Sequence, residues 1–293
     1  MYYKKLKTKS LNKKFKNQKV KETDLIYYLQ LLYSTVAFST FPYLINRNNS
    51  LQALKYNCGN CISLAMTIKN FLKKEKKISS YLIPATIPKQ LYRPGYLNIS
   101  HVALAIPYSK TGVFIVDPAF YFLEPINAVL SNLPRQNLPI FKSKIDSHQT
   151  VLIYSKTYKL SKPLHFNKYQ KISKNTVVCE CINDDNETWM YFLTEILNPD
   201  EAISTFFINI RKDPFITTTE LDNNGICQKK LDLHVRDKNS VDISLRDKHI
   251  YSGLITEIPN ATKNLLENLL GHHFKNSVYE NLLISSNGPY YYN

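Results

Sequence analysis

The sequence predicts an α+β fold in which a helical N-terminal part is followed by an antiparallel β-barrel and then by a mixed α/β part. Before residue 80, apolar side chains recur at steps of three and four residues, as on one face of a helix. After residue 80 come short runs rich in Val, Ile, Tyr and Phe, separated by Pro and Gly, which is typical of strands. A chain of 293 residues with 44% hydrophobic and 21% charged residues is long enough for several packed parts.

Two helices are expected in the N-terminal part. In 24–38 the apolar residues follow the helical period, and Thr23 is the expected N-cap. In 61–72 the helix begins at Cys61, and the lysine-rich run at 73–77 complements the dipole at its C-terminal end.

Strands are expected at 81–87, 101–107, 113–117, 151–155 and 176–181. Beyond residue 186 the pattern mixes helices at 199–210 and 259–272 with strands at 226–234, 240–245 and 249–257. The expected domains are a basic flexible arm at 1–22, a helical domain at 23–80, a β-barrel domain at 81–185 and an α/β lid domain at 186–293.

The formal net charge is +15, and the positive residues are 32 Lys and only 6 Arg. Nine of the lysines fall between Lys4 and Lys21, where few residues are apolar, so this arm is expected to make weak, non-specific contacts with anionic surfaces. Arginine is the residue that makes bidentate contacts with phosphate and guanine. Its scarcity disfavours specific nucleic-acid recognition.

No stretch of the sequence has 18 uninterrupted apolar residues, and no secretory signal is recognised at the N-terminus. An odd number of cysteines, five, argues against a disulfide framework in a chain of this length. We therefore expect a cytoplasmic protein without a transmembrane segment.

Two weaker interpretations concern pairs of cysteines. Cys58 and Cys61 have the spacing of a redox motif, but the βαβ context of such motifs is missing. Together with Cys179 and Cys181 they have nearly the composition of a zinc site, but the second pair is one residue too close. We expect no metal.

The residues that carry chemistry are Cys61, His101 and Asp117. A helix N-terminus favours the thiolate form of a cysteine, and Gly59 permits a tight turn just before Cys61. His101 opens a strand and Asp117 closes the next, and a five-residue loop at 107–111 would place them directly opposite each other. Each residue alone has a more common structural explanation, but together they predict a Cys-His-Asp catalytic triad.

Small residues accompany the predicted base. Ala103 and Ala105 share the face of His101, whereas the residues between them point to the other face of the strand. These small side chains are expected to leave room for a substrate.

The motifs around the triad resemble those of the arylamine N-acetyltransferases, which carry Gly-x-Cys, His and Val-Asp-x-Gly-Phe elements in this order. The matching stretches are Asn57-Cys58-Gly59-Asn60-Cys61, Ser100-His101-Val102 and Ile115-Val116-Asp117-Pro118-Ala119-Phe120. Weaker similarity includes Phe41-Pro42-Tyr43 and the stretch from Phe206 to Thr217.

The resemblance implies a papain-like cysteine-enzyme fold and a two-step reaction. Cys61 would take an acyl group from acetyl-CoA or another acyl-CoA as a thioester, and an amine or peptide acceptor would then remove it. Because the family holds CoA in a cleft between barrel and lid, Thr217 and Thr218 are implied as residues of the donor site.

The sequence departs from the family pattern near the nucleophile. Asn57 and Cys58 stand where the family has Arg and Gly, Ser63 replaces a Glu, and Ala119 replaces a Gly. Three alternatives stay open: transglutaminase-like cross-linking, peptide or amide hydrolysis by the same triad, and a non-catalytic basic binding module.

Overall fold

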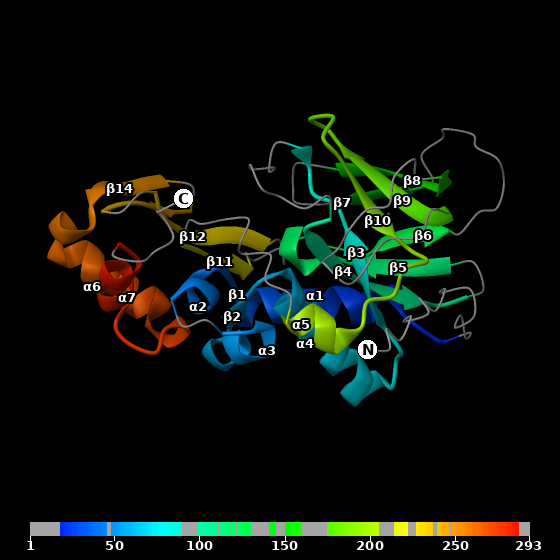
Figure 1. Cartoon of the computed structure of the whole chain (residues 1–293), viewed down its shortest axis with the longest axis horizontal. Coiled ribbons are helices and arrows are strands. Elements are labelled where there is room, and N and C mark those ends of the chain that lie inside the picture. Colours follow the sequence, from blue (N-terminus) through cyan, green and yellow to red (C-terminus); the bar gives the residue numbers. More distant parts are fainter. Residues whose placement is uncertain are drawn as a thin grey trace, which may run out of the picture.

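The computed structural model describes residues 18–45, 48–89, 99–109, 112–120, 122, 124–129, 141–144, 150–159, 175–204, 214–221, 227–236, 239–246 and 248–286. Two sheets lie toward opposite ends of the long axis of the molecule, and the N-terminal helices run along its middle (Figure 1). The fold is α+β and has the three-part architecture expected from the sequence.

Seven α-helices are found among the described residues: α1 (Glu22–Thr35), α2 (Phe41–Leu44), α3 (Ser50–Ala53), α4 (Cys61–Phe71), α5 (Pro199–Ser204), α6 (Asn260–Leu270) and α7 (Val278–Ser286). The expected N-cap was wrong, because α1 already begins at Glu22 and follows Lys21, so Thr23 lies inside its first turn. The end of the helix expected at 199–210 lies outside the described residues. None of the described helices has the length and apolar character needed to cross a membrane.

The larger sheet has eight strands in the order β6-β5-β4-β3-β10-β9-β8-β7, and all of its paired strands are antiparallel. Its strands are β3 (Tyr81–Ala85), β4 (His101–Pro107), β5 (Gly112–Val116), β6 (Ile126–Val129), β7 (Phe141–Lys144), β8 (Thr150–Lys159), β9 (Asn175–Asn183) and β10 (Thr188–Phe192). The terminal strand β6 lies against β7 and β8, so the sheet curls into a nearly closed barrel.

The smaller sheet has six strands in the order β14-β13-β12-β11-β1-β2. Its strands are β1 (Ala37–Ser39), β2 (Cys58–Gly59), β11 (Phe215–Leu221), β12 (Cys227–Val235), β13 (Ser240–Leu245) and β14 (Lys248–Leu254). Strand β1 pairs with β2 in parallel and with β11 in antiparallel orientation, so the segment before the nucleophile is hydrogen-bonded to the C-terminal part.

The strand pairing does not follow the domain limits expected from the sequence. Strand β10 belongs to 186–293 but pairs with β9 and β3 of the barrel, and β1 and β2 belong to 23–80 but lie in the C-terminal sheet. Most of the basic arm at 1–22 lies outside the described residues. Its residue Gln18 is fixed, because its side-chain amide bonds to Ser79 and Pro107.

Strand β4 separates two apolar clusters. Val102, Leu104 and Ile106 pack in the cluster that also contains the apolar faces of α1 and α4. Ala103 and Ala105 pack on the other side, inside the barrel, with aromatic side chains such as Tyr191. The expectation that these alanines leave room for a substrate was wrong, because barrel side chains fill the space beside them.

Candidate active site

The thiol of Cys61 lies at the first residue of α4, as the sequence predicted. Asn60 is the N-cap, and its Oδ1 accepts hydrogen bonds from the backbone N–H groups of Ile62 and Ser63, both at 3.1 Å. A side chain at Gly59 would put its Cβ 2.2 Å from the Cβ of Ser63, so glycine is required there by a close approach of the chain. Cys61 is buried, with 4% of its surface exposed.

Beneath the nucleophile lies a network of uncharged polar groups. The hydroxyl of Ser63 lies 2.7 Å from the hydroxyl of Tyr43 and donates to the carbonyl of Ser50, also at 2.7 Å. The Tyr43 oxygen also accepts from the backbone N–H of Asn60 at 2.8 Å. Burial, the largest influence, raises the pKa of Tyr43, so the phenol stays neutral. Ser63, which stands where the resembling family has a Glu, is therefore satisfied by neutral partners.

His101 and Asp117 meet across β4 and β5, but not in the register expected from the sequence. The pairs Leu104 with Val116 and Ala105 with Ile115, continued along the strands, place Asp117 opposite Ala103. The expected register was wrong by two residues. Because side chains alternate with a period of two, this shift keeps both residues on one face, and Nε2 of His101 still lies 2.7 Å from Oδ2 of Asp117.

Asp117 is buried, and its carboxylate is held from three directions. Besides His101, the hydroxyl of Tyr191 donates to Oδ2 at 2.6 Å, and the backbone N–H of Ala119 donates to Oδ1 at 3.3 Å. A buried carboxylate is stabilised as an anion when several donors point at it. The three donors thus fix the position of the Asp117 carboxylate beside His101.

The sequence analysis missed Tyr191. It lies opposite Ala85, and Ala85 lies opposite His101, so the three residues form one row across β10, β3 and β4. The methyl group of Ala85 between the two larger side chains leaves space for Tyr191 to reach Asp117. The alternation of Trp189 and Tyr191 signals an inward face. It does not reveal that β10 pairs with β3, some hundred residues earlier in the chain.

His101 carries opposing influences on its charge. Burial is the largest and lowers its pKa, whereas the charge and hydrogen bond of Asp117 and the nearby Cys61 side chain raise it. The net result is a pKa raised to about 10, so the ring is an imidazolium at neutral pH. Since Asp117 takes Nε2, Nδ1 is the nitrogen left for Cys61. The structure thus joins His101 to Asp117 by a hydrogen bond and places Cys61 near enough to the imidazole to influence its pKa.

An aromatic wall flanks the imidazole. The ring of Phe120 lies 4.7 Å from that of His101 and 5.6 Å from that of Trp189, measured between ring centres. On the side of the smaller sheet, Phe38 packs against the cluster that contains Cys61 and stacks on Phe215.

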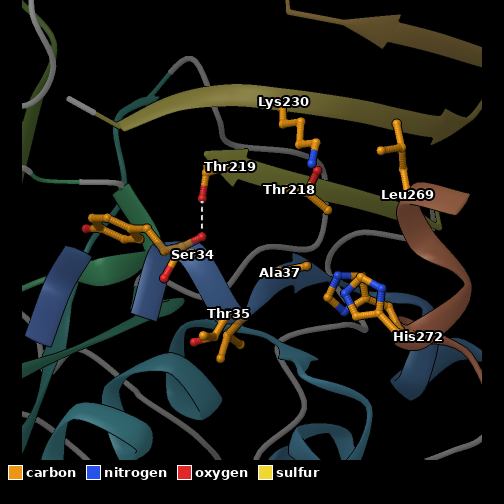
Figure 2. A pocket seen from close by; sticks show the side chains of 11 residues that line it. Ser34, Thr35, Ala37, Thr218, Thr219, Lys230, Leu269 and His272 are labelled. Carbon is orange, nitrogen blue, oxygen red and sulfur yellow. Dashed lines mark hydrogen bonds between the residues drawn. The ribbon is translucent and has the colours of Figure 1, made fainter. Parts of the chain in front are cut away.

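The two threonines implied as CoA contacts lie on opposite faces of β11. Thr217 pairs with Phe38, and its hydroxyl donates to Asp232 at 2.5 Å. Thr218 lines a pocket on the other face, together with residues that follow α6 (Figure 2). Thus only Thr217 shares a face with Phe38.

Cys58, Cys179 and Cys181 do not join this site. Cys58 is in the apolar cluster of the smaller sheet, apart from that of Cys61, and burial raises its pKa to about 12. Cys179 and Cys181 lie inside the barrel. Together with Cys61, these three are free thiols. Within the part of the chain that the structure describes, no three His, Cys, Asp or Glu side chains form a group that could hold a metal ion.

No protein-family model matches the sequence, and no curated protein matches it. Several solved structures match the fold over most of both chains. An arylamine N-acetyltransferase from Nocardia farcinica has a TM-score of 0.58 at 10% identity and covers 97% of this chain and 93% of its own. The chain has the arylamine N-acetyltransferase fold. This confirms the resemblance drawn from the sequence at the level of the fold.

Two further structures with the arylamine N-acetyltransferase fold bear on the site. The enzyme from Bacillus cereus, described with a unique Cys-His-Glu catalytic triad, has a TM-score of 0.53 at 18% identity, covering 87% of this chain and 92% of its own. The Mycobacterium marinum enzyme in complex with CoA has a TM-score of 0.50 at 12% identity, covering 91% and 92%. This chain has Asp117 as the acidic partner of His101.

Proposed function

We propose that this protein is a cysteine-dependent N-acyltransferase that moves an acyl group from acyl-CoA through a Cys61 thioester to an amine. The observation that carries the proposal is the buried hydrogen bond between His101 and Asp117, beside Cys61 at the N-terminus of α4. It is supported by the fold, because the matching solved structures are arylamine N-acetyltransferases, one of them in complex with CoA.

In the first half-reaction the Cys61 thiolate attacks the carbonyl carbon of the acyl donor. His101, as imidazolium, gives its proton to the departing CoA sulfur, and the acyl group stays on Cys61 as a thioester. In the second half-reaction an amine attacks the thioester, and His101 takes the proton of the amine as Cys61 leaves. Asp117 keeps the ring oriented and stabilises its positive charge.

The helix end can stabilise the negative oxygen formed in both steps. The first N–H groups of a helix have no partner within the helix, and Asn60 takes those of Ile62 and Ser63. The backbone N–H of Cys61 is then the group that remains for the carbonyl oxygen of the acyl group. Asn60 accepts from the N–H groups of Ile62 and Ser63, and the N–H group of Cys61 is thus left for the substrate oxygen.

Thr217 is the better of the two proposed CoA contacts, because it shares a face with Phe38. Its hydroxyl already donates to Asp232, so its remaining capacity is that of an acceptor. We expect Thr217→Val to raise the KM for acetyl-CoA and Thr218→Val to leave it unchanged. An equal rise for both variants would contradict the facial assignment.

The decisive experiment is intact-mass analysis of the full chain after incubation with acetyl-CoA and with longer acyl-CoAs. A mass increase of one acyl group is expected on the wild type and on Cys58→Ala, and none on Cys61→Ala. Addition of an arylamine should restore the original mass and release the N-acylated amine. If no acyl-CoA labels Cys61 while a peptide or amide is hydrolysed, the protein is a hydrolase.

A further inference from the structure

The pocket that Thr218 lines lies on the face of the smaller sheet that is turned away from Cys61. In this sheet Phe38 packs toward the cluster of Cys61, whereas its neighbour Ala37 and the β11 residue Ile216 pack toward α6 and α7. Thr218 follows Ile216 by two residues and so shares its face. The pocket is enclosed by the end of α1, by β11 and β12, and by the turn after α6 (Figure 2).

Thr218 supplies an unused polar group to this pocket. Its side chain is 8% exposed, and its hydroxyl has no hydrogen-bond partner. A buried hydroxyl without a partner costs free energy, so such a group calls for an explanation such as a bound ligand. Figure 2 shows Thr218 pointing into the pocket from β11.

Lys230 supplies the positive charge. Its ammonium group reaches into the pocket from β12, beside Thr218 (Figure 2). Lys230 belongs to none of the ion pairs among the described residues. Its charge acts at longer range on Glu220, whose pKa is lowered first by the hydrogen bond of Arg246 and then by nearby charges that include Lys230.

The hydroxyl donors of the opposite wall already use their protons in hydrogen bonds to backbone carbonyls. The hydroxyl of Thr219 donates to the carbonyl of Tyr33 at 2.7 Å, and the hydroxyls of Ser34 and Thr35 donate to the carbonyl of Leu31 at 2.9 and 2.8 Å. No carboxylate lines the pocket. The donors that the pocket can offer to a ligand are therefore the ammonium of Lys230 and the hydroxyl of Thr218.

His273 at the rim adds polarity but no fixed charge. His273 binds the carbonyl of Tyr56 through Nδ1 at 3.1 Å, and burial, with help from His272, lowers its pKa to about 4. His273 is therefore neutral at physiological pH and leaves Nε2 as an acceptor. A neutral ring tolerates an anion nearby and can accept a hydrogen bond from a protonated one.

We propose that this pocket binds a small oxyanion of the phosphate or sulfate class, held by the ammonium of Lys230 and the hydroxyl of Thr218. Its volume of about 80 Å³ gives room for a tetrahedral group but not for a nucleotide. The site is independent of the acyl transfer proposed above, because it lies on the opposite face of the sheet from Cys61.

The alternative is that Lys230 is structural. The last turn of α1 contains no basic residue, and a cation near a helix C-terminus complements the dipole. A purely structural lysine would stabilise the protein equally in every salt. A ligand site would add a stabilisation that depends on the identity of the anion.

The test is the thermal unfolding of the full chain in sodium phosphate, sodium sulfate and sodium chloride at matched ionic strength. Matched salt is essential because a chain with a net charge of +15 is stabilised by any screening anion. Phosphate or sulfate at roughly ten times its Kd is expected to raise the Tm by roughly 2–4 °C over chloride. Calorimetric titration with phosphate should show one site per chain.

Three variants separate the explanations. Lys230→Met and Thr218→Val are expected to abolish the difference between phosphate and chloride. Lys229→Met is the matched control, because it removes the same charge from the adjacent residue, which pairs with Asp232, and it should keep the difference. Equal shifts in all variants would show screening by an adventitious ion only and would overturn the proposal, as would the absence of any difference in the wild type.

Discussion

The phenol oxygen of Tyr191 lies 2.6 Å from Oδ2 of Asp117, the same carboxylate oxygen that Nε2 of His101 approaches to 2.7 Å. Tyr191 thus holds the acid of the predicted triad at the same oxygen as the histidine. The contact is buried, and burial, followed by the charge of Asp117, raises the pKa of Tyr191. The phenol therefore stays protonated and keeps its hydrogen for Asp117.

Tyr191→Phe is expected to lower kcat/KM by roughly tenfold to a hundredfold, since a hydrogen bond to a charged group contributes about 1.5–3 kcal/mol. The loss should appear in kcat and in the alkaline limb of the pH profile, because Tyr191 acts through Asp117 and His101. Tyr251→Phe is the control, as its hydroxyl bonds to Leu254 in the smaller sheet. If turnover is unchanged in Tyr191→Phe, Tyr191 has only a structural role.

Asp117→Asn is expected to reduce activity by about three to four orders of magnitude while the chain still folds. The amide keeps the shape of the side chain but removes the charge that stabilises the imidazolium of His101. Steady-state kinetics with acetyl-CoA and an arylamine, together with circular dichroism of both proteins, provide the measurement. Near-normal turnover would mean that Asp117 only forms the turn before Pro118.

The charge of His101 links folding to pH. Its pKa is raised from the ordinary 6.5 to about 10 in the folded protein. A raised folded-state pKa gives a stabilisation that is fully present below pH 6.5 and is lost as the pH rises toward 10. The difference in unfolding free energy between the wild type and His101→Gln should therefore shrink steadily across this window, as measured by urea unfolding. A difference that grows with pH would contradict the raised pKa.

Iodoacetamide should alkylate Cys61 in preference to Cys58, because Cys61 lies at the N-terminus of α4 beside the imidazolium of His101. Cys58 is the internal control, because burial raises its pKa to about 12 and its side chain is inaccessible. Peptide mapping after labelling at several pH values gives the two rates. If the alkylation rate of Cys61 varies with pH as that of an ordinary thiol does, the hypothesis of an activated thiol is wrong.

Asn60→Ala is expected to destabilise the protein by about 0.5–2 kcal/mol and to slow alkylation of Cys61, because the N–H groups of Ile62 and Ser63 lose their cap. Asn60→Ser retains a capping oxygen and should recover most of both losses. Chemical unfolding and the labelling rate measure the two effects. If stability falls but the labelling rate does not change, the Asn60 cap stabilises the helix without affecting the reactivity of Cys61.

The sequence by itself determined the local elements and the faces of their side chains. The helix beginning at Cys61 and the strand 101–107 appear as expected. They are encoded locally, by a capping residue before an apolar stripe and by a continuous buried run. The same period-two alternation made the hydrogen bond between His101 and Asp117 predictable in spite of the two-residue error in register.

Only the tertiary structure decided which distant segments meet. The pairing of β10 with β3 brings Tyr191 to Asp117, and the pairing of β11 with β1 separates Thr217 from Thr218 onto two faces. These pairings depend on apolar burial summed over whole clusters of side chains, and no single stretch of sequence encodes them. The histidine and aspartate of the predicted triad could therefore be found from two adjacent strands, whereas the tyrosine that holds Asp117 and the pocket behind β11 required the fold.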